Sequence, residues 1–170
     1  MILIDREQDN IMHHIIILFD SSKSMDRRLV ESAKDRLRDI MPRIDFKVSF
    51  VIVGNKPLVL IKDELYSPQM LENLQAGNGL SNLGLALSEC YNMAMGSKSS
   101  TTILYVGDGT STDDFNPIQM PTVSIVQNQI ALLMTRSLIH SEHLQRFEKY
   151  AFNEEEVNRL RKRLCSIIEY

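Results

Sequence analysis

The sequence contains no tryptophan, and aromatic residues make up only 6% of its 170 positions. Proteins that bind single-stranded nucleic acids commonly stack bases on exposed aromatic rings, so this scarcity speaks against such a surface. A strong charge of either sign is missing as well, because 19 Lys and Arg residues against 22 Asp and Glu residues leave a net charge of -3. Bulk electrostatics therefore favour neither nucleic acid nor an anionic membrane as a partner.

Cysteine is scarce too, and Cys90 and Cys165 follow no spacing that is typical of a metal site. Both fall in helix-like stretches beside apolar residues, which predicts buried, reduced thiols and favours the cytoplasm. Residues 1–10 turn acidic after four apolar residues, a run too short for the core of a signal peptide. Elsewhere no apolar run approaches the length of a membrane span. We therefore expect a cytoplasmic protein without membrane segments.

Core-forming residues, in contrast, are plentiful, and several segments have the pattern of strands. Residues 15–19 (Ile-Ile-Ile-Leu-Phe) are continuously apolar, as in a strand that is buried on both faces of a parallel sheet. Residues 45–54 and 57–62 are separated by so short a link that an antiparallel hairpin is predicted. Residues 101–109 indicate a buried strand ending in a polar turn, and we favour residues 129–134 over 122–127 as the last core strand.

Helical periodicity alternates with these strands. Residues 25–42 place apolar side chains on one helical face, and Pro42 ends the pattern. A short helix is predicted at 67–75, a longer one opens from the glycine-rich residues 76–84, and residues 141–152 also have helical spacing. The apolar faces expected in the two long helices are Leu29, Val30, Ala33, Leu37, Ile40 and Met41 in the first, and Leu83, Ala86, Leu87, Cys90 and Ala94 in the second.

A last helix is predicted at about 154–168, where Asn153 and Glu156 have the spacing of a capping pair. Its expected apolar stripe is Val157, Leu160, Leu164 and Ile167. This order of elements predicts a single α/β domain over residues 1–170, with its core at about 13–150. We expect a doubly wound, mostly parallel sheet with one antiparallel edge strand and helices on both faces.

Three segments place unusual polar residues where the predicted strands end or the helices begin. They are residues 20–24 (Asp-Ser-Ser-Lys-Ser), 79–84 (Gly-Leu-Ser-Asn-Leu-Gly) and 107–114 (Gly-Asp-Gly-Thr-Ser-Thr-Asp-Asp). Ligands of doubly wound folds bind beyond the carboxyl ends of the parallel strands. The three segments are therefore expected to converge on one site.

Oxygen donors dominate these segments, which favours a hard cation such as Mg²⁺ or Mn²⁺, and no His or Cys is present there to favour zinc. The aspartates would supply charge, and the serine hydroxyls would supply neutral ligands. The predicted metal ligands are Asp20, Ser22, Ser24, Ser81 and Asp108. Each has a simpler explanation when taken alone, because serine is a common helix cap and Asp-Gly a common turn pair.

Together the three segments resemble the metal-ion-dependent adhesion site of von Willebrand factor type A domains. Asp20, Ser22 and Ser24 match the Asp-x-Ser-x-Ser signature that follows a hydrophobic strand. Residues 80–87 (LSNLGLAL) match the second motif, with Ser81 in the place of its Thr, and residues 108–109 match the Asp-Gly of the third. The resemblance covers about residues 13–150, and Lys23 departs from it where the family often has Gly.

This resemblance implies a Rossmann-like fold and a metal-dependent protein-interaction module rather than an enzyme. In the family, the bound metal completes its shell with an Asp or Glu carboxylate from a partner protein. Stand-alone intracellular domains of this kind are similar to those of bacterial multi-protein systems, such as tellurium-resistance-associated proteins and partners of AAA+ ATPases.

Two alternatives remain open. The fold could serve as a metal-free scaffold or adaptor. A magnesium-dependent phosphatase of the haloacid-dehalogenase type would also have an aspartate at the end of its first strand, which makes Asp20 a candidate nucleophile. That family normally has a second Asp two residues later as general acid, and here this place holds Ser22, whose hydroxyl cannot perform that role at neutral pH.

Overall fold

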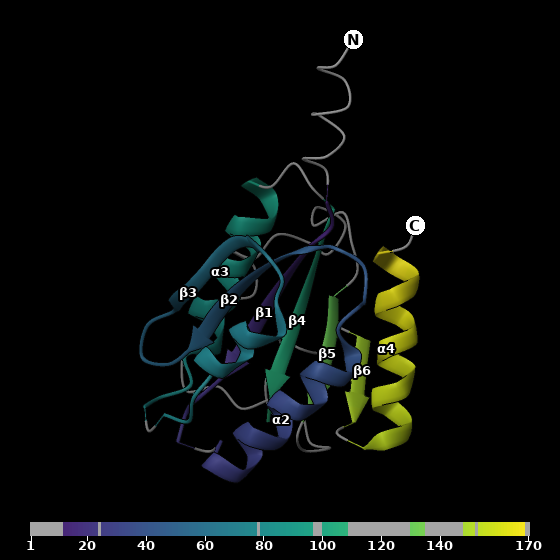
Figure 1. The fold of residues 1–170 in the computed structure, drawn as a ribbon. Coiled ribbons are helices and arrows are strands. Elements are labelled where there is room, and N and C mark those ends of the chain that lie inside the picture. The colour runs from purple at the N-terminus through teal and green to yellow at the C-terminus, as the bar shows by residue number, and fades with distance from the viewer. Residues whose placement is uncertain are drawn as a thin grey trace.

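A computed structural model describes residues 12–23, 25–77, 79–96, 100–108, 130–134, 148–151 and 153–168. Its strands are β1 (His14–Asp20), β2 (Lys47–Val53), β3 (Leu58–Leu65), β4 (Thr101–Gly107), β5 (Ile130–Met134) and β6 (Glu148–Ala151). Its helices are α2 (Arg27–Ile40), the short 3₁₀ helix η1 (Pro68–Asn73), α3 (Leu83–Gly96) and α4 (Glu154–Ile168). The strands form one central sheet, and the helices pack against it (Figure 1).

The described strands form a six-stranded sheet in the order β3-β2-β1-β4-β5-β6. β1 is paired in parallel with both β2 and β4, and β5 and β6 continue the parallel arrangement. Only β2 and β3 are antiparallel, which confirms the predicted hairpin at one edge of the sheet. The predicted fold class, mostly parallel with one antiparallel edge strand, is confirmed.

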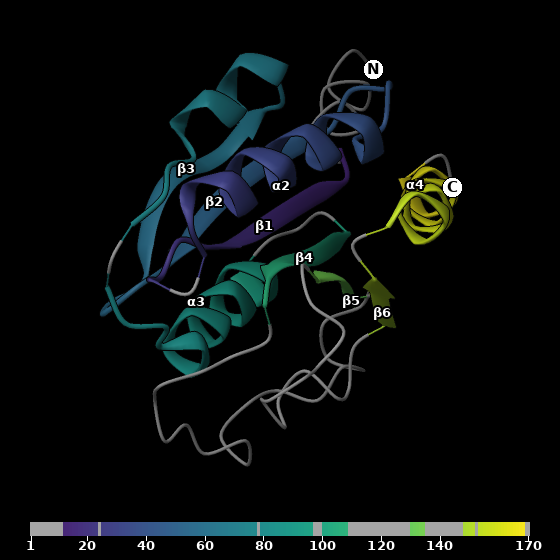
Figure 2. The same ribbon diagram turned by 90° about the horizontal axis from the view of Figure 1, so that it is seen from below.

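Helices cover both faces of this sheet, as predicted: α3 lies on one face, and α2 and α4 lie on the other (Figure 2). Successive side chains of a strand point to opposite faces. Ile15, Ile17 and Phe19 therefore join the core beneath α2 and α4, while Ile16 and Leu18 join the core beneath α3. This double burial explains why the first strand is apolar at every position from 15 to 19.

The predicted apolar faces of α2 and α3 point largely into these cores. Val30, Ala33, Leu37 and Ile40 of α2 are buried, while Leu29 is partly exposed. All five residues predicted for α3 are buried. α2 ends at Ile40, two residues before Pro42, because the residue that precedes a proline is disfavoured in helical conformation.

Two predictions are wrong. Residues 148–151 are not helical but form β6, which pairs in parallel with β5, and residues 141–147 lie outside the described part of the chain. Pairing with β5 overrides the helical spacing of apolar residues here, and Tyr150 of β6 is buried. Cys165 is half-exposed rather than buried, whereas Cys90 is buried as expected, and neither forms a disulfide.

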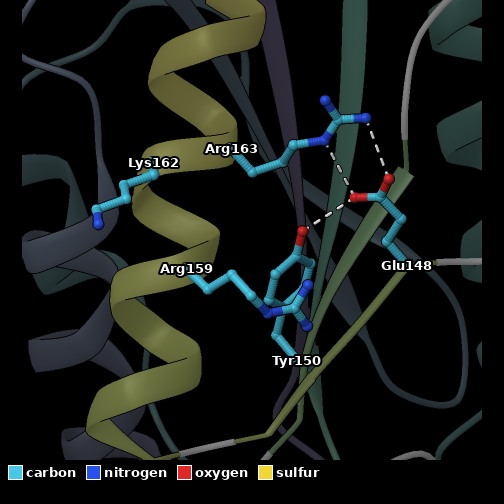
Figure 3. Close-up of a pocket in the computed structure, with 5 residues that line it drawn as sticks. All are labelled: Glu148, Tyr150, Arg159, Lys162 and Arg163. Carbon is cyan, nitrogen blue, oxygen red and sulfur yellow. Dashed lines mark hydrogen bonds and ion pairs between the residues drawn. The ribbon is translucent and has the colours of Figure 1, made fainter.

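The last helix, α4, packs beside this edge of the sheet. Val157, Leu160 and Leu164 are buried, and Ile167 stays partly exposed. Polar contacts add to this apolar stripe, as Figure 3 shows: the Arg159 guanidinium lies 4.2 Å from the centroid of the Tyr150 ring. Arg163 donates two hydrogen bonds to the Glu148 carboxylate, at 3.1 and 3.3 Å. No helix within the described ranges is both long and apolar enough to cross a membrane.

Two buried histidines occupy the opposite end of β1 from Asp20. The His13 ring contacts the hydroxyls of Ser100 at 2.7 Å and Thr102 at 2.9 Å, and the His14 ring contacts that of Ser49 at 2.7 Å. Burial, together with the neighbouring His14, lowers the pKa of His13 to about 4. His13 is therefore neutral at physiological pH, and its ring links the start of β1 to Thr102 of β4.

The cap of α4 provides a direct test of the helix assignment. The Asn153 side chain accepts a hydrogen bond from the backbone N–H of Glu156 at 2.9 Å, which confirms the predicted cap. We expect Asn153→Ala to lower the free energy of unfolding by about 1 kcal/mol, because that N–H loses its acceptor. Urea denaturation measures the change. The matched control is Asn158→Ala, four residues into the helix, and an equal loss there would contradict the assignment.

Candidate metal centre

Four of the five predicted ligand residues lie at the carboxyl edge of the sheet, and all four are buried. Asp20 ends β1, and Asp108 directly follows β4, its parallel neighbour. Ser22 lies in the loop after β1, and Ser81 lies two residues before α3. Their exposed fractions are between 0% and 3%. The fifth residue, Ser24, lies outside the described residues.

The Asp20 carboxylate is the centre of this arrangement. Its Oδ1 accepts a hydrogen bond from the backbone N–H of Ser22 at 2.9 Å. The Ser22 hydroxyl and the Asp108 carboxyl are also within hydrogen-bonding reach of the Asp20 carboxyl. Its other oxygen, Oδ2, is buried and has no hydrogen-bond partner in the described part of the chain. A buried carboxylate oxygen of this kind can serve as a cation ligand.

These surroundings disfavour the ionised form of Asp20. Burial raises the pKa of Asp20 from its ordinary value near 3.8 to about 6, the hydrogen bonds from Ser22 oppose the rise, and the neighbouring Asp108 adds to it. At neutral pH the metal-free protein therefore holds a carboxylate that is poorly solvated and lies beside a second acid. A bound cation would relieve both penalties.

Ser22 is not needed as a helix cap, because Asp26 performs that role. The Asp26 carboxylate accepts a hydrogen bond from the backbone N–H of Leu29 at 2.8 Å, and α2 begins only at Arg27. The simpler explanation of Ser22 as the cap of α2 is therefore wrong. A chain segment of six residues lies between the end of β1 and the helix, and it places Ser22 against Asp20.

The loop after β1 is joined to the glycine-rich loop that precedes α3. The backbone N–H of Lys23 donates to the carbonyl of Gly79 at 3.1 Å. Close by, the chain passes so near to Ser21 that a Cβ at Gly77 would come within 3.3 Å of the Ser21 Oγ and nearer still to its backbone. The two loops that carry Ser22 and Ser81 are thus held in contact.

The β2–β3 turn supports the same glycine-rich loop, a role that the sequence did not indicate. The Asn55 Oδ1 accepts from the backbone N–H of Leu80 at 2.9 Å, and the Asn55 carbonyl accepts from the Asn82 side chain at 2.8 Å. The backbone N–H of Asn82 also donates to the carbonyl of Gly54 at 3.1 Å. An Asn in a short turn predicts only the turn, since its long-range contacts leave no local signal.

Gly107 is a second residue whose role became visible only in the structure. A Cβ at this position would lie 2.8 Å from the Cβ of Asp20 and still nearer to the ring of Tyr105. The absence of a side chain at the end of β4 therefore allows β1 and β4 to bring Asp20 and Asp108 together.

In the described ranges, no group of three His, Cys, Asp or Glu side chains could hold a metal ion. A metal at this edge would depend on two carboxylates with serine hydroxyls. Such a donor set fits a hard cation that keeps further ligands from water or from another molecule.

Known structures resemble the fold of this chain, although their sequences have little identity with it. The VWA2 paralogue of ArnB from Sulfolobus acidocaldarius superposes with a TM-score of 0.60 at 16% identity, over 91% of this chain and 44% of that one. The BatB protein of Bacteroides thetaiotaomicron superposes with a TM-score of 0.67 at 11% identity, over 92% of this chain and 99% of that one. The chain has the fold of von Willebrand factor type A domains.

A third solved structure is relevant to the site. Proximal thread matrix protein 1 of the mussel byssus, described with a zinc-occupied MIDAS motif, superposes with a TM-score of 0.69 at 11% identity, over 92% of this chain and 45% of that one. The chain spans less than half the length of the first structures it matches. No protein-family model and no curated protein sequence matches it.

The contact at Gly107 predicts that Gly107→Ala destabilises the protein. A methyl group between Asp20 and the Tyr105 ring forces the strands apart, and overpacking of this kind costs about 1–3 kcal/mol. Urea denaturation measures the loss. The matched control is Gly96→Ala at the end of α3, where an added Cβ meets nothing within 4 Å and the stability should stay the same or rise. Equal effects of the two changes would contradict the close approach of the strands.

The raised pKa of Asp20 predicts a pH-dependent gain in stability for Asp20→Asn. The folded state holds the Asp20 proton more tightly than the unfolded state. The stabilisation of the folded state by protonated Asp20 is therefore fully present below pH 3.8 and is lost as the pH rises through about 6. In chelator, we expect Asp20→Asn to be more stable than the wild type at pH 7.5, by about 2–3 kcal/mol at most.

That advantage should shrink at pH 4.5, and urea denaturation at both pH values measures it. Comparison of the two proteins removes the opposite contribution of His13, which both share. Asp39→Asn, a change at an exposed aspartate of α2, is the control and should show no such pH-dependent gain. A loss of stability in Asp20→Asn that is the same at both pH values would contradict the raised pKa.

Proposed function

We propose that this protein is a metal-dependent protein-interaction module. Mg²⁺ or Mn²⁺ would bind at Asp20, Ser22, Ser24, Ser81 and Asp108, and an Asp or Glu side chain of a partner protein would complete the coordination. The observation that carries this proposal is the buried pair of carboxyl groups at the ends of β1 and β4, where the Asp20 Oδ2 has no hydrogen-bond partner among the described residues.

The charge of the donor set supports an open coordination position. Two carboxylates balance the charge of one divalent cation, and the remaining ligands offered by the chain are neutral hydroxyls. Mg²⁺ requires six oxygens in near-octahedral geometry, so the five residues leave at least one position for water or a partner carboxylate. Oxygen ligands alone favour Mg²⁺ or Mn²⁺ over softer metals.

A binding role is supported further by the chemistry that the site lacks. Ser22 stands where a phosphatase of the haloacid-dehalogenase type would have its general acid, and the Ser22 backbone is bonded to the Asp20 carboxylate. We therefore propose a non-enzymatic module that acts in the cytoplasm. Its partner would be another component of a bacterial multi-protein system.

Metal binding should stabilise the folded state. At a metal concentration about 100 times the dissociation constant, the gain is about 2.7 kcal/mol. For a protein of this size that gain corresponds to a rise of about 5–10 °C in melting temperature. Thermal melts with Mg²⁺, Mn²⁺ or chelator measure it. Asp20→Ala combined with Asp108→Ala should abolish the rise, whereas Asp39→Ala, at an exposed aspartate of α2, should retain it.

A wild-type melting temperature that does not respond to either metal would leave only the scaffold alternative. An assay with an aryl phosphate separates the enzymatic alternative from both. Turnover that depends on magnesium and is lost in Asp20→Asn would show that the protein is a phosphatase.

A further inference from the structure

Two exposed side chains flank the buried residues of the metal centre. Lys23 directly follows Ser22, and Leu80 directly precedes Ser81. In each pair the serine is buried, at 3% exposure, while its neighbour faces the solvent; Leu80 is 54% exposed. The same two loops that carry the proposed ligands therefore carry one cationic and one apolar side chain outside them.

These two positions are fixed by backbone contacts. The N–H of Lys23 is bonded to the carbonyl of Gly79, which is the residue before Leu80, and the N–H of Leu80 is bonded to the Asn55 side chain. The three chain segments that meet here hold the two Cα atoms in place before any partner arrives. Such preorganisation reduces the entropy that binding must overcome.

The Lys23 side chain is exposed. It forms no ion pair with any described residue. The two arginines of the groove between α4 and β6 differ in this respect, because Arg163 forms an ion pair with Glu148 (Figure 3) and Arg159 forms one with Glu156. That groove has a volume of about 510 Å³, but its two arginines are already neutralised from within the chain.

A second exposed leucine, Leu58, lies at the same end of the sheet as Leu80. Leu58 begins β3 directly after the turn that contains Asn55, and it is 54% exposed. Single exposed leucines are ordinary on protein surfaces. Here two of them lie on the chain segments that Asn55 joins, beside the loop with the proposed metal ligands.

We propose that Lys23 and Leu80 select the partner of the metal centre. The partner segment carries two neighbouring acidic residues and an apolar residue. One carboxylate completes the metal shell, the second pairs with the Lys23 ammonium, and the apolar side chain packs on Leu80. This proposal rests on the proposed function, since it requires the bound metal, but it assigns specificity to residues that are not metal ligands.

The test uses synthetic blocked peptides and the ¹⁵N-labelled protein saturated with Mg²⁺. The reference peptide contains Leu-Asp-Asp between glycines. Comparison peptides replace either Asp by Asn, or Leu by Ala. Chemical-shift titrations at millimolar peptide concentration give the affinities. We expect the reference peptide to bind about fivefold more tightly than each comparison peptide, the gain of one ion pair or one small apolar contact.

Variants then assign each preference to its residue. Lys23→Ala should weaken the reference peptide about fivefold and leave the affinities of the single-Asp peptides almost unchanged. Leu80→Ser should weaken the binding of the reference peptide about fivefold. It should leave the affinity of the peptide that has Ala in place of Leu almost unchanged. The matched controls are Lys62→Ala and Leu65→Ser, both exposed and near the opposite end of β3, and neither should change any affinity.

The outcomes separate this proposal from the proposed function. A metal-dependent rise in melting temperature without any saturable peptide binding would overturn the partner chemistry and keep the metal site. An equal loss of affinity for all peptides in Lys23→Ala would also overturn the partner chemistry and keep the metal site, because it would indicate a general effect on metal binding. The absence of a metal-dependent rise would overturn both.

Discussion

Asp20 and Asp108 place two carboxyl groups side by side in a region that solvent does not reach. Burial of an ionised carboxylate is expensive unless hydrogen bonds or a cation compensate it. The chain supplies part of this compensation through the backbone N–H and the hydroxyl of Ser22, and it leaves the Asp20 Oδ2 without a partner in the described part of the chain. A protein that needed only stability would place an apolar residue at one of these strand ends. The chain keeps two buried carboxyl groups here although their burial lowers its stability, and this is the strongest physical reason to regard this edge as a functional site.

Sheet topology explains why the site forms at this point. From β1 the chain passes through α2 to β2 on one side, and after the hairpin it passes through α3 to β4 on the other side of β1. The two connections also cover opposite faces of the sheet, as Figure 2 shows. The loops that leave the strand ends therefore diverge, and ligands of doubly wound folds bind in the crevice between them. Gly107 permits the close contact of β1 and β4, and the Lys23–Gly79 hydrogen bond limits how far the loops separate.

Much of this could be predicted, because its signals are local. The unbroken apolar run at 15–19 indicated a strand buried on both faces, and strand-terminal polar residues indicated the carboxyl edge where Asp20, Ser22, Ser81 and Asp108 now lie. What could not be predicted depends on distant partners. The helical spacing at 148–151 gave way to pairing with β5, and Asn55 supports a loop 25 residues away. No pattern within either segment contains that information.

Lys23 is best understood through the difference between buried and exposed charge. Because its side chain is exposed, water and salt would screen the repulsion between its ammonium and a bound cation. Binding of a metal would instead be governed by the buried carboxylates, whose attraction would be far less screened. Lys23 would thus have little influence on whether a cation binds, and its charge would act mainly on molecules that approach from solvent. A positive charge that would oppose metal binding inside the site would, on the surface beside it, allow a metal to bind and attract an acidic partner.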